Sequence, residues 1–138
     1  MTSQIIPVEP FDFIMFGATG DLAERKLLPS LYRRQTAGQF SEPTRIIGAS
    51  RTKMTTDEFR EVARRSLNDY VRMEELDSDE VERFLARLQY VSVDAKSGGG
   101  FPELKEAIGD SQAIRVFYLA VGPELFGGIA DQVEGHGL

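Results

Sequence analysis

Residues 11–23 constrain the fold of this chain more than any other segment. An apolar run ends at Gly17, a second glycine follows at Gly20, and a helix-forming sequence begins directly after it. This order predicts a β-strand, a tight turn and the first turn of a helix. Because the first turn of a helix has unpaired N–H groups and a partial positive charge, this arrangement can hold the pyrophosphate of a dinucleotide.

Apolar runs and helical patterns alternate along the rest of the sequence. Pro29 lies within the first predicted helix and should kink or divide it, and Gly38 suits a left-handed residue at its end. Thr55 and Glu58 have the spacing of a capping box, which predicts a helix start. Strands are expected at residues 11–16, 44–50, 89–93 and 113–120, and helices at residues 20–37, 55–72, 77–88, 102–108 and 123–134.

The alternation of strands and helices predicts a mainly parallel sheet with helices on both faces, which is a doubly wound, Rossmann-like α/β domain. Such domains usually have about six strands, and only four are predicted here. We therefore expect a partial or minimal version of this fold, with a sheet edge that another segment could cover.

Length, composition and charge limit the class of protein. The length predicts a single domain, residues 1–138, of which residues 1–9 are expected to be flexible. The absence of cysteine excludes disulfides and thiolate metal sites, and it is compatible with the cytoplasm. No apolar run approaches the roughly 18 residues of a membrane helix, and the N-terminus does not resemble a signal peptide. With a net charge of −6, we expect neither nucleic acid nor a membrane as a partner.

The glycine turn has the spacing Gly17-x-x-Gly20-x-x-Ala23 rather than the common Gly-x-Gly-x-x-Gly. Gly17 can form the turn at the strand end, and Gly20 would let the backbone approach a pyrophosphate without an intervening Cβ. Ala23 is small enough for close packing of the helix against the strand. Glycine pairs also occur in such turns for steric reasons alone, and the spacing does not distinguish the two explanations.

The end of the second predicted strand indicates which dinucleotide would bind. An NAD site normally has an acidic residue there, whereas this strand ends in Ser50 and Arg51, with Lys53 close behind. Ser50 can donate a hydrogen bond, and Arg51 can pair with a 2′-phosphate and stack on adenine. The sequence therefore favours NADP, the alternative being that both cations are solvated loop residues.

Ligands of open α/β sheets bind outside the carboxyl ends of the strands. Asp94 follows the third predicted strand, and Ala120 and Val121 follow the fourth, so we expect them near the adenosine and nicotinamide parts of a cofactor. Asp94 could equally be a turn residue. His136 is the only histidine, and its position between two glycines near the chain end is a poor one for a general base. The sequence assigns no catalytic residue.

The segment 17–29 resembles the N-terminal coenzyme domain of glucose-6-phosphate dehydrogenase. The turn Gly-x-x-Gly-Asp-Leu-Ala is followed by Lys26 and Pro29, and residues 46–51, 90–91 and 116–123 support the resemblance. It implies an oxidoreductase that transfers hydride from C1 of glucose 6-phosphate to NADP, the first step of the pentose phosphate pathway. It also implies that Arg51 contacts the 2′-phosphate, that Lys26 reaches the sugar phosphate, and that the pyrophosphate lies on Gly17, Ala18, Thr19, Gly20, Asp21 and Leu22.

The resemblance further implies a second, α+β domain and a catalytic base, neither of which we find in these 138 residues. We therefore expect the chain to be a fragment that is inactive by itself, from an enzyme that forms a homo-oligomer. Two other hypotheses stay open at this point. One is a non-catalytic module that senses NAD(P), and the other is an α/β domain whose ligand site has been lost.

Overall fold

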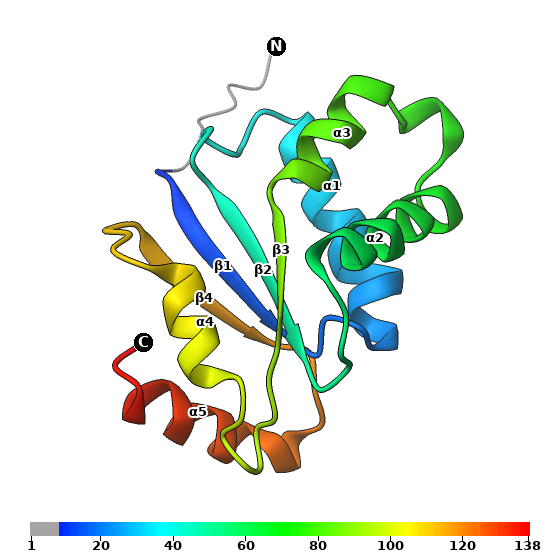
Figure 1. Ribbon diagram of the computed structural model, residues 1–138. Coiled ribbons are helices and arrows are strands. Elements are labelled where there is room, and N and C mark those ends of the chain that lie inside the picture. The colour runs from blue at the N-terminus through cyan, green and yellow to red at the C-terminus, as the bar shows by residue number, and fades with distance from the viewer. Residues whose placement is uncertain (1–8) are drawn as a thin grey trace.

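The computed structural model describes residues 9–138, and the expected flexible N-terminal segment lies outside this range except for Glu9. Within the described residues, four parallel strands form one sheet in the order β3-β2-β1-β4. Figure 1 shows α1, α2 and α3 on one side of the sheet and α4 and α5 on the other. The predicted Rossmann-like α/β architecture is confirmed. The strands are β1(Phe11–Phe16), β2(Arg45–Ser50), β3(Leu88–Ser92) and β4(Ile114–Leu119).

Two hydrophobic layers follow from the alternation of side chains along β1. Phe13 and Met15 point to one face and pack with residues of α1(Leu28–Thr36), α2(Thr56–Tyr70) and α3(Ser78–Ala86). Ile14 and Phe16 point to the other face and pack with residues of α4(Phe101–Ile108) and α5(Phe126–Gly135). A strand buried on both faces needs apolar residues at successive positions, which explains why β1 is a continuous apolar run after Asp12.

Pro29 divides the first helix, as its sequence position predicts. The helical segment η1(Ala23–Leu27) is a π-helix in which the Leu28 N–H donates to Ala23 O, and α1 follows directly. Because proline lacks an N–H and its ring crowds the carbonyl four residues earlier, a wider turn accommodates it. Gly38 has a φ of 76° and ends the helix in the left-handed conformation, also as predicted.

Local capping positions the other helix starts. Thr55 and Glu58 form the predicted capping box, with the Glu58 N–H donating to Thr55 Oγ1 over 3.1 Å. The Asp77 side chain accepts the Glu80 N–H over 3.0 Å at the start of α3. Short 3-10 turns, η2(Met73–Glu75) and η3(Pro123–Leu125), precede α3 and α5.

Several predicted boundaries differ from the structure by one or two residues, and tertiary packing decides two of them. Leu88, which was expected on a helix, begins β3 and is fully buried. The second helix ends at Tyr70 rather than at residue 72, because Val71 turns to an extended conformation and its side chain enters the core.

β4 lies at the edge of the sheet and is covered on one face only. Its Phe117 and Leu119 pack beneath α5, whereas Ile114, Val116 and Tyr118 on the other face are 61%, 38% and 39% exposed. The expected cover of both faces is therefore incomplete at this edge.

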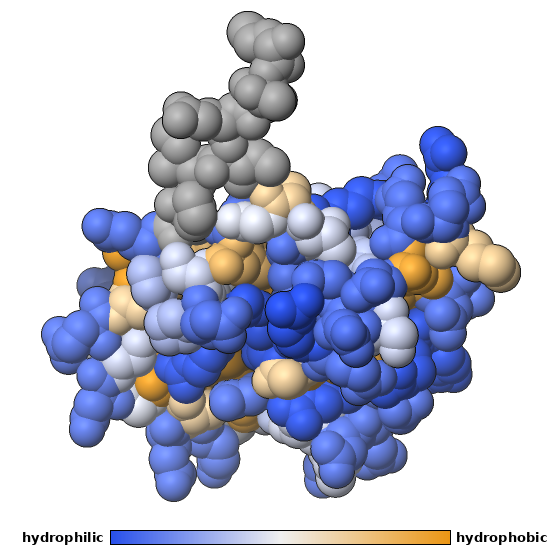
Figure 2. Space-filling view, turned by 90° about the horizontal axis from the view of Figure 1, so that it is seen from above, coloured by the Kyte–Doolittle hydropathy of each residue, from blue (hydrophilic) through white to orange (hydrophobic). Residues whose placement is uncertain are grey.

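Hydrophilic residues cover most of the molecular face seen from the amino ends of the strands, and hydrophobic residues there form small separate groups (Figure 2). Among residues 9–138, no helix is both long and apolar enough to cross a membrane.

Candidate functional site

A pocket of about 470 Å³ lies at the carboxyl ends of the strands. The turns that follow β1, β2, β3 and β4 all contribute to its walls. Parallel strands deliver their carboxyl ends to one edge of the sheet, so segments far apart in sequence meet there. Of the residues predicted to form the site, those that line this pocket are Gly17, Thr19, Gly20, Ser50, Arg51, Asp94, Ala120 and Val121.

The glycine turn is held in place mainly by contacts with other segments of this chain. Gly17 has a φ of 81°, and a Cβ there would overlap the carbonyl group of Ala120. The N–H groups of Gly17 and Ala18 both donate to Ala49 O, over 2.8 and 3.2 Å. Ala18 is buried in the core next to α2 rather than lining the pocket. These two residues therefore support the turn by packing and hydrogen bonding, and their N–H groups already have acceptors.

The backbone N–H groups that lack an acceptor within the helix belong to the residues that follow Gly20. The Glu24 N–H donates to Gly20 O over 3.1 Å, which is the first hydrogen bond of the helix. The N–H groups of Asp21, Leu22 and Ala23 precede that bond, so they have no acceptor within the helix. Asp21 and Leu22 have exposed side chains, and the Asp21 carboxylate pairs with Arg25 at 3.6 Å. Their backbone, not their side chains, is what they can offer to an anion.

Gly20 lies beside this helix start, where the lack of a side chain leaves part of the pocket unfilled. A Cβ at Gly20 would meet only Gly17 O, at 3.3 Å, and Gly20 lines the pocket. A side chain there would occupy space next to the unpaired N–H groups, at the cost of one tight contact with the backbone. Packing thus requires glycine at position 17 much more strictly than at position 20.

A cluster of hydroxyl groups joins the ends of the first three strands. Thr19 Oγ1 lies 2.9 Å from Ser50 Oγ and 3.2 Å from Thr52 Oγ1, and Ser50 Oγ lies 2.6 Å from the Tyr90 hydroxyl. Burial raises the pKa of Tyr90, and a hydrogen bond with Ser50 partly offsets that effect. Sequence reasoning did not find Tyr90 or Thr52, because the cluster is assembled from separate strands.

Arg51 lies directly after β2 with an exposed side chain at the pocket wall. Lys53 is also exposed but does not line the pocket. Lys96, which the sequence analysis did not consider, does line it. Of the two cations expected beside the second strand, the structure therefore brings Arg51 alone to the pocket.

Asp94 lines the pocket and also closes its own loop. Its carboxylate accepts the Lys96 N–H over 2.9 Å, and its backbone pairs with Gly98 and Gly99. The Lys96 N–H holds the pKa of the Asp94 carboxyl below its usual range. Burial acts in the opposite direction, and hydrogen bonds from Ser97 and the charge of Arg51 lower the pKa further. Asp94 is thus a turn residue as well as a part of the pocket wall.

Lys26 and His136 lie away from the pocket walls. Lys26 is exposed on η1 and does not line the pocket. The His136 ring stacks on Phe101 with centroids 5.7 Å apart, and its Nδ1 lies 2.9 Å from Gln132 O. Among residues 9–138, no group of three or more His, Asp or Glu side chains could hold a metal ion.

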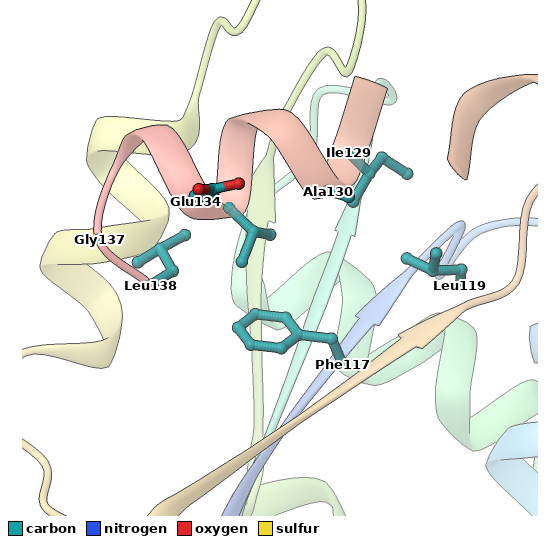
Figure 3. Close-up of a pocket in the computed structure, with 8 residues that line it drawn as sticks. Phe117, Leu119, Ile129, Ala130, Glu134, Gly137 and Leu138 are labelled. Carbon is teal, nitrogen blue, oxygen red and sulfur yellow. The ribbon is translucent and has the colours of Figure 1, made fainter. Parts of the chain in front are cut away.

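A second hollow, of about 570 Å³, lies between β4 and α5. Figure 3 shows Phe117 and Leu119 projecting from β4 toward the helix that carries Ile129 and Ala130. Its charged lining residue is Glu134, and the rest of the lining is mainly apolar. A phosphate-bearing ligand would find no cation there, so the pocket at the strand ends is the better candidate site.

The parallel sheet, the glycine turn and the pocket at the strand ends define a Rossmann-like, dinucleotide-binding domain. The family model described as "Glucose-6-phosphate dehydrogenase, NAD binding domain" matches residues 14–138. The chain therefore belongs to this family and is a nicotinamide-dinucleotide-binding domain.

Curated relatives are similar over nearly the whole of this chain. Glucose-6-phosphate 1-dehydrogenase from Rhizobium meliloti (strain 1021) is 55% identical over 100% of this chain and 28% of its own length. The enzyme from Mycolicibacterium smegmatis is 44% identical over 96% of this chain and again 28% of its own length. The chain thus spans about 28% of the length of these relatives and corresponds to a part of them.

Solved structures agree with this assignment. A glucose-6-phosphate 1-dehydrogenase from Mycobacterium avium superposes with a TM-score of 0.82 and 28% identity, over 92% of this chain and 27% of that one. A glucose-6-phosphate dehydrogenase in complex with its substrate also gives 0.82, with 27% identity over 99% of this chain and 29% of the other.

Proposed function

We propose that this chain is the NADP-binding part of a glucose-6-phosphate dehydrogenase. That enzyme oxidises glucose 6-phosphate at C1 to the 6-phosphogluconolactone and reduces NADP. The observation that carries the proposal is the meeting of the glycine turn, the helix start and Arg51 in one pocket at the strand ends. Membership in the family favours this function over a sensor module or a domain that has lost its ligand site.

The helix start would hold the pyrophosphate. The unpaired N–H groups of Asp21 and Leu22 and the positive end of the helix attract an anion, and Gly20 leaves room for it to approach. Gly17 and Ala18 would contribute by fixing the turn, since their N–H groups are already bonded to Ala49 O. Thr19 would form part of the pocket wall beside the pyrophosphate.

Arg51 would select NADP over NAD. Its guanidinium can form charge-assisted hydrogen bonds with the 2′-phosphate, and β2 does not end in the carboxylate that an NAD site would use for the ribose. Asp94 also lines the pocket, but its carboxylate accepts an N–H of its own loop. Ala120 and Val121 would form the wall toward the nicotinamide.

Lys26 would reach the sugar phosphate from outside this pocket. When bound, NADP supplies the acceptor for the hydride, and the chain's residues hold and orient it. We propose that the sugar pocket and the catalytic base belong to the part of the relatives that this chain does not span. Correct positioning can supply about 7–11 kcal/mol of a barrier, so the 138 residues alone should be inactive. The complete enzyme would act as a homo-oligomer in the cytoplasm.

Calorimetric titration of the 138-residue chain with NADP and with NAD tests the proposal. We expect heat of binding with NADP, a rise of the melting temperature in its presence, and weaker binding of NAD. Heat and thermal protection from neither nucleotide would refute a coenzyme site. A glucose 6-phosphate-dependent increase in NADPH absorbance from the 138 residues alone would refute the proposal that the sugar pocket and the catalytic base lie outside this chain.

A further inference from the structure

The Tyr90 hydroxyl belongs to the hydroxyl cluster and is hydrogen-bonded to the backbone beside Arg51. Tyr90 belongs to β3, it is 7% exposed, and its ring packs against Phe59 with centroids 5.2 Å apart. Its hydroxyl lies 2.5 Å from Thr52 O and 2.6 Å from Ser50 Oγ. A residue of the neighbouring strand therefore reaches both residues that flank Arg51.

The protons of these groups can be placed by elimination. Thr52 O, at 2.5 Å, and Ser50 O, at 3.3 Å, are carbonyls and can only accept, so the single proton of the Tyr90 hydroxyl points to this side, chiefly to the nearer Thr52 O. The contact between Tyr90 and Ser50 then requires Ser50 to donate to the Tyr90 oxygen. Ser50 Oγ in turn accepts from Thr19 Oγ1. The Ser50 hydroxyl proton is therefore used within the protein. The sequence predicts Ser50 as a donor to a ligand, and the structure does not leave this proton free for that role.

Arg51 is held through its backbone while its side chain stays free. Ser50 and Thr52 on either side are bonded to Tyr90, and Ser92 Oγ donates to Arg51 O over 3.4 Å. All of these anchors come from β3. The exposed guanidinium consequently projects from a fixed segment, and fixing a group before binding lowers the entropy that binding must overcome.

We propose that Tyr90 is a positioning residue whose hydroxyl fixes the segment 50–52 and so presents Arg51 to the 2′-phosphate, which sets the preference for NADP over NAD. This inference rests on the proposed function. Tyr90 itself does not line the pocket and acts through Arg51. Its loss should therefore change the affinity for NADP and leave that for NAD, which has no 2′-phosphate, nearly unchanged.

Tyr90→Phe tests the inference, because it removes the hydroxyl and keeps the ring against Phe59. We expect the Kd for NADP to rise about three- to tenfold, the range for one lost hydrogen bond, and that for NAD by less than about twofold. Tyr32→Phe is the matched control. Tyr32 is also buried, and its hydroxyl donates to Glu75 O over 3.2 Å, away from the pocket. It should leave both Kd values unchanged.

A double-variant cycle separates positioning from a general structural role. In an Arg51→Ala background, Tyr90→Phe should no longer weaken NADP binding, because the residue through which it acts is gone. The same loss in both backgrounds, or equal weakening of NADP and NAD, would overturn the inference. If Arg51→Ala weakens NADP selectively and Tyr90→Phe does not, the proposed function stands and this inference is wrong. Wild-type chain that binds neither nucleotide overturns both.

Amide hydrogen exchange without ligand gives a second, independent measurement. Tyr90→Phe should speed hydrogen exchange at the amides of residues 51–53. The exchange rate of the Ile47 amide, in the centre of β2, should stay unchanged. Unchanged exchange at residues 51–53 would show that the hydroxyl does not fix this segment, and it would overturn the inference whatever the affinities are.

Discussion

Gly17 packs directly against the carbonyl group of Ala120, so the turn after β1 is joined to the end of β4 with no space for a side chain. The Ala120 N–H donates to Phe16 O over 2.9 Å at the same junction. The left-handed φ of 81° at Gly17 adds a second reason for glycine. The first glycine of the motif therefore serves the fold.

Gly17→Ala should destabilise the domain. The added Cβ meets backbone atoms of Ala120 that cannot move without disturbing β4, and alanine is strained at this φ. We expect the free energy of unfolding to fall by about 2–4 kcal/mol, from overpacking of about 1–3 kcal/mol together with backbone strain. Urea unfolding followed by circular dichroism measures this. An unchanged midpoint would show that the junction is looser than described.

Gly20→Ala should separate binding from folding. Its Cβ would meet only Gly17 O, at 3.3 Å, a tight contact that should lower stability much less than the overlap at Gly17 does. The same Cβ would occupy pocket space beside the helix start, and we expect at least about a tenfold loss of NADP affinity, equivalent to about 1.4 kcal/mol. Calorimetry and thermal melting check the two effects separately. Wild-type affinity in this variant would argue against a pyrophosphate at this turn.

Arg51→Ala should weaken NADP binding much more than NAD binding. A hydrogen bond to a charged group is worth about 1.5–3 kcal/mol, which corresponds to roughly 10- to 150-fold in the Kd for NADP. Lys53→Ala is the matched control, because Lys53 is an exposed cation two residues away that does not line the pocket. Equal loss of both nucleotides in Arg51→Ala would mean that Arg51 does not contact the 2′-phosphate.

Asp12→Asn should lower stability in a pH-dependent manner. Asp12 is 1% exposed and accepts from Arg45 Nε and Nη2 over 2.9 and 3.0 Å. Burial acts to raise the pKa of Asp12, but hydrogen bonds from Arg45 and Ser111 and the charge of Arg45 bring it below its ordinary 3.8. We expect a loss of about 1–3 kcal/mol at pH 7, measured by urea unfolding.

The sign of the pH dependence follows from the lowered pKa. The carboxylate contributes its stabilisation above the ordinary pKa of 3.8, and that contribution is lost as pH falls through the lower pKa of the folded state. The difference in the free energy of unfolding between wild type and Asp12→Asn should therefore be constant near neutral pH and shrink in acid. Asp69→Asn, at an exposed position on α2, should change stability little at any pH. A difference that grows in acid would contradict the described ion pair.

Local sequence signals predicted the elements that depend on neighbouring residues. The capping box of Thr55 and Glu58, the left-handed Gly38 and the division of the helix at Pro29 involve residues within a few positions of one another. Such features can be read from sequence because they do not require a partner from elsewhere in the fold. The segment that follows Gly17 likewise indicated the family, which the family match confirms.

Tertiary structure alone decided which of these residues meet. Sequence could not show that Ala18 is buried, that Lys26 lies outside the pocket, or that Tyr90 reaches across to Ser50 and Thr52. The contacts of Tyr90 join residues 38 and 40 positions apart, and they exist only after parallel pairing aligns the strand ends. The amino-acid sequence thus determined the strand–turn–helix and the family. The packed sheet determined that Gly17 supports the fold, that Gly20 leaves space, and that β3 holds the segment carrying Arg51.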